Sequence, residues 1–174
     1  MKKLLTGLAI VGLFFTTPTF ANDPAALSDV EIAHVAYTAD VLDIRYAHLA
    51  LAKSKNANIH KFAKTMIRDH EAVNEQALAL LKKLGASAKD NFLSQKLNQD
   101  GEALIAKFSA LSGSEFDVAY AENELAYHKA VNALVGDVFI PNIDNAEVKA
   151  LFEEGLRIFQ AHETHAEMMV KALK

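Results

Sequence analysis

The sequence contains no cysteine, no tryptophan and only three prolines among its 174 residues. The absence of cysteine excludes disulfide bonds, thiolate nucleophiles and cysteine-ligated metal sites. Any metal ion bound by this chain must therefore be held by histidine, carboxylate, methionine or tyrosine side chains. The scarcity of proline leaves long segments in which nothing interrupts helical hydrogen bonding.

Positive charge is also scarce. The chain has 18 Lys and Arg residues against 22 Asp and Glu residues, with a formal net charge of −4. No basic cluster occurs anywhere along it. A mildly acidic surface is a poor electrostatic partner for nucleic acid or anionic lipid, so we expect no nucleic-acid partner.

The first 21 residues have the composition of a signal peptide. Lys2 and Lys3 precede an apolar run over residues 4–15, and the segment ends in the small-residue sequence Thr19-Phe20-Ala21. The run is shorter than the roughly 18 residues of a spanning helix, and no later segment is long and apolar enough to span. We therefore predict export, with cleavage after Ala21, to the periplasm or the outer membrane of a Gram-negative bacterium, and no transmembrane segment in the mature chain. The alternative is that the segment is retained as an N-terminal anchor.

Apolar residues recur with a helical period through most of the rest of the chain. We predict four long helices over residues 28–54, 57–85, 113–138 and 145–173, and a weaker helix near 91–110. Helix starts are marked by Ser28-Asp29-Val30-Glu31 and Ser112-Gly113-Ser114-Glu115, by Asp144 and by Asn56 or Asn58. Helix ends are marked by Gly85, Gly136 and Pro141.

The lengths of the connections predict how these helices pack. Tight turns make the first two helices antiparallel and the last two antiparallel, whereas the connection over residues 86–112 is long enough to cross the bundle. This pattern predicts an all-α, ferritin-like four-helix bundle whose long crossover carries a short extra helix; a simple up-down-up-down bundle is the alternative. The predicted domain covers residues 28–174 and follows a flexible N-terminus at residues 22–27.

Each of the four long helices carries metal-competent side chains near its apolar face. At 100° per residue, Asp117, Glu124 and His128 fall within about 40° of one another on the third long helix. The candidate metal ligands from all four helices are Asp43, His70, Asp117, Glu124, His128, His162 and His165. Polar groups from four helices of one bundle can meet at a single point, where they form a site.

Each of these residues also has a plainer explanation. A single inward-facing histidine more often bonds a neighbour than a metal, Glu124 and His128 can form a surface pair, and Met66 and Met169 are more often packing residues than ligands. The combination is harder to explain in this way. Burying several ionisable groups in one small bundle is unfavourable unless they pair or coordinate an ion. We therefore predict a shared site in the bundle interior.

Two sequence segments resemble a known family. These are Phe62-Ala63-Lys64-Thr65-Met66-Ile67-Arg68-Asp69-His70 and Gly113-Ser114-Glu115-Phe116-Asp117-Val118-Ala119-Tyr120, followed by His128 and His162. They are similar to motifs of bacterial domain-of-unknown-function family forty-one forty-two, whose members are often labelled outer membrane proteins and grouped with ferritin-like folds. The resemblance spans nearly all of residues 28–173 and implies a fold and a compartment rather than an activity. Asp43 stands where family members usually have Glu.

The spacing of the ligands argues against a di-iron oxidase. Such a site needs a Glu-x-x-His motif on each of two helices, but the residues three before His70 and His162 are Ile67 and Phe159. An imidazole-rich set suits a transition-metal ion such as copper, zinc or iron. We expect binding, buffering or sensing of that ion rather than catalytic turnover. The alternatives are a metal-free envelope-stress or interaction protein with a structural polar network, and a di-metal oxidase of unusual ligation.

Overall fold

The computed structural model describes residues 22–173, which are almost entirely helical. The elements are a short 3₁₀ turn Pro24–Ala26 and the helices α1 Asp29–Lys53, α2 Ala57–Lys83, α3 Phe92–Ala110, α4 Gly113–Ala133, α5 Ile140–Asn142 and α6 Ala146–Ala172, with a π-helical segment Leu134–Phe139 between α4 and α5. The four long helices and the helix in the crossover were predicted with their limits close to these. None of the helices in the described range is long and apolar enough to cross a membrane.

The helix starts follow their sequence signals in part. Ser28 and Glu31 form the predicted capping box, and the side chain of Asn56 accepts a hydrogen bond from the backbone of Asn58. The prediction of a capping box at Ser112 was wrong, because its side chain makes no capping hydrogen bond. The fourth long helix is capped by Asn145 rather than by Asp144. In the segment that we expected to be flexible, the 3₁₀ turn is followed by the buried Leu27.

The third long helix, predicted over residues 113–138 with Gly136 and Pro141 as its stop signals, extends a few residues further than predicted. Helical backbone continues from α4 through the π segment Leu134–Phe139 and α5 to Asn142. Gly136 lies inside this π segment, where the added backbone freedom of glycine is compatible with helical continuation. Pro141 lies in the first turn of α5, where the lack of a backbone N–H is tolerated.

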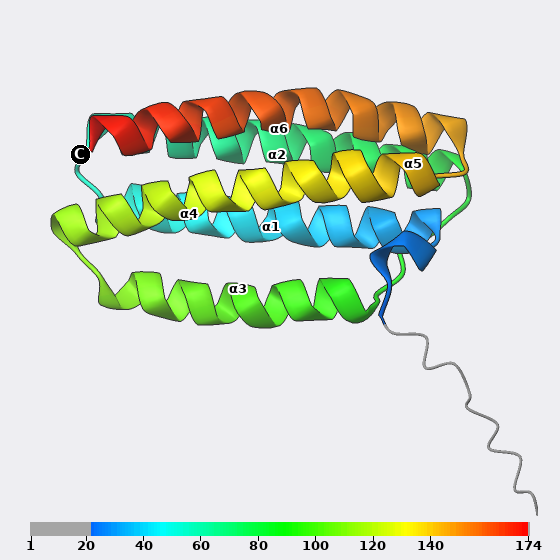
Figure 1. The fold of residues 1–174 in the computed structure, drawn as a ribbon, viewed down its shortest axis with the longest axis horizontal. Helices are drawn as coiled ribbons and strands as arrows, with labels where there is room; N and C mark the ends of the chain where they lie inside the picture. Colours follow the sequence, from blue (N-terminus) through cyan, green and yellow to red (C-terminus); the bar gives the residue numbers. More distant parts are fainter. Residues whose placement is uncertain (1–21, 174) are drawn as a thin grey trace, which may run out of the picture.

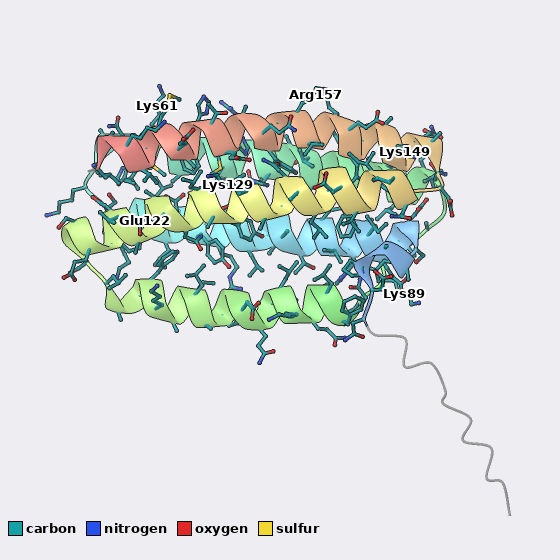
Figure 2. All side chains as sticks on the ribbon, in the orientation of Figure 1. Lys61, Lys89, Glu122, Lys129, Lys149 and Arg157 are labelled. Atoms are coloured by element: carbon teal, nitrogen blue, oxygen red, sulfur yellow. The ribbon has the colours of Figure 1, made fainter. Side chains whose placement is uncertain are left out.

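The long helices form two antiparallel pairs, α1 with α2 and α4 with α6, and α2 also packs along α6 (Figure 1). The crossover helix α3 runs back along the bundle, so that α2 and α4 point in the same direction (Figure 1). This is the crossover arrangement that we predicted, rather than the simple up-down-up-down bundle. Charged side chains such as Lys61, Lys129 and Arg157 lie on the outside of the helices (Figure 2).

Helix α3 packs on the side of α1 that faces away from the bundle centre (Figure 1). The contact is close at Gly101, where an added Cβ would lie 2.4 Å from Leu42 Cδ2 and 3.1 Å from the Tyr46 hydroxyl. Helix α1 is therefore covered on two sides, with Leu42 and Tyr46 against α3. This leaves another face of α1 for the bundle centre, and that face carries Asp40 and Asp43.

The apolar core is divided into two clusters. One is built around Tyr46, Phe62 and Tyr120, and the other around Val35, Phe139 and Phe152. Along α2, α4 and α6, a buried histidine lies in sequence between residues of the first cluster and residues of the second. The buried polar residues therefore occupy the middle of the bundle, with apolar packing on either side.

A candidate metal centre

Three histidines from three helices meet in this polar layer. His70 of α2, His128 of α4 and His162 of α6 are all at most 3% exposed. Their ring centroids are 5.9 Å apart for His70 and His128, and 5.3 Å apart for each pair that includes His162. Asp43 of α1 and Glu124 of α4 lie beside them and are fully buried. The structure thus brings together five of the seven side chains that the sequence singled out.

Each of the three imidazoles is held through one ring nitrogen by an outer partner. His70 Nδ1 donates to Asp40 Oδ1 at 2.7 Å. His128 Nδ1 donates to the backbone carbonyl of Glu124 at 2.9 Å, and His162 Nε2 donates to Asp69 Oδ2 at 3.0 Å. Metal-ligating histidines almost always bond their second nitrogen to a carboxylate or carbonyl in this way, because the bond fixes the tautomer and the orientation of the ring.

The opposite nitrogen of each ring is buried and has no hydrogen-bond partner within residues 22–173. These atoms are His70 Nε2, His128 Nε2 and His162 Nδ1. One ring nitrogen from each histidine lies within 4.8 Å of the nitrogens of the other two. His70 Nε2 is also 2.7 Å from Asp43 Oδ2, which is an ion-pair contact when the imidazole is charged. The unpaired atoms of the site are therefore gathered in a small volume.

A second ligand group overlaps the first. Asp43, Glu124 and His128 each offer an atom within 4.8 Å of the others. Asp43 Oδ2 lies 4.0 Å from His128 Nε2, so this carboxylate reaches both His70 and His128. Neither carboxylate of this group has a hydrogen-bond partner in the described part of the chain. The donor set is thus three imidazoles with Asp43 between two of them and Glu124 alongside.

The electrostatics of the site centre on His70. Burial disfavours its charged form, but the adjacent carboxylates of Asp43 and Asp40 raise the pKa of His70 to about 10. Burial likewise opposes ionisation of Asp43, yet His70 lowers the pKa of Asp43 below its ordinary value. The pKa of Asp40 is raised because burial outweighs the attraction to His70. Without a metal, His70 is therefore an imidazolium between two aspartates.

The pKa values of the other two histidines, His128 and His162, are shifted downward, in the opposite direction to that of His70. Burial lowers the pKa of His162 to about 4 and also lowers the pKa of His128. Both rings are therefore neutral at pH 7, and each directs a lone pair from its unpartnered nitrogen. Burial and the nearby charge of Asp43 raise the pKa of Glu124 well above its ordinary value, which favours its protonated form. The site holds fewer charges than its composition suggests.

The remaining two predicted residues are not part of the cluster. His165 is exposed, because it is three residues beyond His162 and lies about 60° away around α6. Asp117 is half-buried and belongs to neither ligand group. It lies on nearly the same side of α4 as Glu124, but seven residues earlier, which is about 10 Å along the helix axis. The angle of Asp117 around α4 was predicted correctly, but its position along the bundle axis was not.

Three residues that shape the site were not among the predicted ligands. Asp40 anchors His70, and its position on α1 was hidden because that helix is covered on two sides. Asp69, the residue before His70 in the sequence, anchors His162. Phe159 stacks on His70 with ring centroids 4.9 Å apart and planes 14° apart. Its spacing of three residues before His162 placed it on the same face of α6.

Comparison with known proteins yields a family but no relative of known activity. No curated protein and no solved structure matches this chain. A family model does match, over residues 15–169, which includes α1, α2 and α4 and all but the last three residues of α6. On that match the chain belongs to the family described as "Domain of unknown function (DUF4142)".

Proposed function

We propose that the protein binds one transition-metal ion in the middle of its bundle. The ligands are His70, His128 and His162, with Asp43 as a fourth donor and Glu124 beside it. One observation supports the proposal above the others: three imidazoles are anchored through one nitrogen and turn the other nitrogen into one buried volume. Within residues 22–173, His128 Nε2 and His162 Nδ1 have no hydrogen-bond partner there, and His70 Nε2 meets only the carboxylate of Asp43. Buried polar atoms are normally hydrogen-bonded, so a cluster of unpaired ones calls for a binding partner.

The chemistry of the donors indicates the class of metal. Imidazole and carboxylate together suit zinc, copper and iron(II), whereas magnesium and calcium prefer oxygen donors alone. With metal–nitrogen bonds of about 2.0–2.1 Å, tetrahedral ligand atoms lie roughly 3.3 Å apart. The histidine nitrogens lie within 4.8 Å of one another, so a small contraction completes the site. Asp43 reaches His70 at 2.7 Å and His128 at 4.0 Å, so it could serve as a fourth ligand and leave no coordination position open for a substrate. Such a site favours binding over turnover.

A second function has its own supporting observation. His70 already contacts a carboxylate at each ring nitrogen, Asp40 on one side and Asp43 on the other. An imidazolium paired in this way can fix which helices face one another without any metal. In that case the protein is a metal-free structural or interaction module. His128 Nε2 and His162 Nδ1 then remain unexplained, which is why metal binding is the first proposal.

Titration of the metal-free protein with Zn²⁺, Cu²⁺ and Fe²⁺ tests the first proposal. Calorimetry and native mass spectrometry should show one ion per chain for at least one of these metals. His162→Ala should weaken that binding by at least roughly a hundredfold, because it removes a ligand. The matched control is His165→Ala, an exposed histidine on the same helix, which should leave affinity unchanged. Equal effects of the two variants would place the metal on the surface and contradict the proposal.

Replacement of His128 with Leu separates the two functions. If the polar layer is purely structural, the variant loses roughly 1–3 kcal/mol in the free energy of unfolding, because polar partners are left unpaired. If the layer holds a metal, the metal-free variant tolerates the change and its stabilisation by added metal disappears. Urea unfolding of wild type and variant with and without each metal gives the answer. A large loss in the variant, with wild-type curves that no metal shifts, supports the structural function.

We further propose that the protein meets its metal outside the cytoplasm. The support is the composition of residues 1–21, which lie outside the described residues. N-terminal sequencing of the protein purified from its native cell envelope should begin at Asn22. A chain that begins at Met1 would contradict cleavage and favour an N-terminal anchor.

A further inference from the structure

A second internal feature adjoins the polar layer. A partly enclosed cavity of about 190 Å³ lies between α1, α2, α4 with its π segment, and α6, towards the end of the bundle that contains Phe139 and Phe152. Two residues of its wall also belong to the metal-centre region. Asp40 holds His70 by a hydrogen bond, and Phe159 stacks on the same ring. The cavity and the polar layer therefore share a wall.

The cavity exists because small side chains line it at positions where a close-packed core would have large side chains. Ala33, Ala36 and Ala39 face the cavity from α1, and Ala77 and Gly155 face it from α2 and α6. Protein interiors are close-packed, and voids of this size are destabilising when nothing fills them.

The packing around position 155 does not require a glycine. A Cβ added there would meet only the ring of Phe159, with Cε2 at 3.6 Å and Cζ at 4.0 Å, which are ordinary contact distances. Alanine would fit at this position and favours a helix interior more than glycine does. The glycine therefore keeps the cavity wide at the expense of helix stability.

The wall is apolar except at the end next to the polar layer. Asp40 uses Oδ1 to bind His70, which leaves Oδ2 as an acceptor. Asn74, one turn beyond His70 on α2, is buried and also lines the cavity, and its side-chain amide can donate and accept. The hydroxyl of Tyr127 is already bonded to the carbonyl of Ala39 at 2.9 Å. The polar end thus matches one small hydrogen-bonding group.

We propose that this cavity binds a small phenol, with its ring among the apolar side chains and its hydroxyl between Asp40 and Asn74. The volume fits, because an apolar protein cavity of about 150 Å³ accommodates benzene. A hydroxyl can donate to the carboxylate and accept from the amide, whereas a charged group would be buried without a full counterpart. The proposal does not depend on bound metal, since the cavity has its own lining.

The test uses p-cresol and toluene, which have similar rings and differ in the hydroxyl group. Calorimetry and thermal unfolding are carried out with an excess of chelator, so that a metal–phenolate contact cannot contribute. The purified protein should bind one p-cresol and show a higher melting temperature. Toluene should bind roughly tenfold more weakly, the effect of one lost hydrogen bond. Absence of p-cresol binding, or equal affinity for the two ligands, would overturn the proposal.

Two kinds of variant locate the bound ligand. Gly155→Leu fills the cavity and should abolish p-cresol binding; Ala77→Leu fills it from α2 and serves if the first variant does not fold. Asn74→Leu should remove the preference for p-cresol over toluene. The control is Ala161→Leu, which adds the same side chain to the exposed face of α6. If p-cresol binding survives both filling variants, the ligand is bound elsewhere and the proposal is wrong.

Discussion

Phe159 lies parallel to His70, with ring centroids 4.9 Å apart, and separates the polar layer from the apolar cavity. One face of its ring supports an imidazole that we propose as a metal ligand. The same side chain forms part of the wall of the proposed phenol site. Packing, metal affinity and ligand binding therefore depend on one residue of α6.

Replacement of Phe159 with Ala should reduce both stability and metal affinity. Loss of a buried phenylalanine costs about 3–5 kcal/mol in the free energy of unfolding. Loss of the stacked ring also frees His70 to rotate, so metal affinity should fall along with stability. The matched variant is Phe152→Ala, which removes another buried phenylalanine from the same helix and the same cavity. It should be similarly destabilised but should bind metal with wild-type affinity, as measured by calorimetry under native conditions.

Metal binding should release a proton. His70 must lose the proton that Asp40 and Asp43 help it to hold, and its pKa of about 10 means that it is charged at neutral pH. Metal affinity should therefore rise by about tenfold per pH unit between pH 7 and 9, and metal should raise the melting temperature more at pH 7.5 than at pH 5. Calorimetry in buffers of different ionisation enthalpy gives the number of protons released. An affinity that does not change with pH would mean that His70 is not a ligand.

Without metal, stability should decline on both sides of a maximum near pH 6.5. The raised pKa of His70 contributes stability that is fully present below the unfolded value of about 6.5 and is lost as the pH rises towards 10. The lowered pKa of His162 contributes in the opposite sense, because neutral His162 must gain a proton on unfolding as the pH falls from 6.5 towards 4. Urea unfolding in the presence of chelator across this pH range measures the free energy of unfolding on the acid arm and on the alkaline arm of the curve. Asp40→Asn should flatten the alkaline arm, and an unchanged alkaline arm in that variant would contradict the assignment.

Gly101→Ala should destabilise the protein through the contact between α3 and α1. The new Cβ would lie 2.4 Å from Leu42 Cδ2, and Leu42 is only 1% exposed and has little room to move. Overpacking of this kind typically costs about 1–3 kcal/mol, against which better helix propensity returns roughly 1 kcal/mol. Gly155→Ala is the control, because its Cβ makes an ordinary contact and should give a neutral or slightly stabilising change. A more stable Gly101→Ala variant would show that Leu42 can move aside.

The helices were predictable from sequence because each long one carries its own period, cap or stop signal. The crossover helix over Phe92–Ala110 was judged weaker, since its main partner is α1 alone and its apolar face is narrow. The continuation past residue 138 could not be anticipated, because a π segment changes the hydrogen-bond register without a distinct residue pattern.

The convergence of three histidines could be predicted from angles around each helix, but the anchoring residues could not. Angle alone does not give the level along the bundle, which is why Asp117 and Glu124 seemed equivalent. It also fails for α1, which is covered on two sides, because Leu42 and Tyr46 pack against α3 while Asp40 and Asp43 face the bundle centre. Whether a residue reaches the site depends on its level along the bundle axis and on which helices pack against its own, and both are set by the tertiary fold.

The division of the core into two apolar clusters has a consequence for how the molecule opens. Each cluster can act as a separate cooperative unit if the layer between them is weakly held, because local unfolding follows the boundaries of well-packed regions. A metal ion that joins α2, α4 and α6 would fasten the two units together. Backbone amides around Phe62 and around Phe152 should then exchange with solvent at different rates in the metal-free protein and at one common, slower rate when metal is bound. The bound ion would therefore determine the size of the unit that unfolds cooperatively.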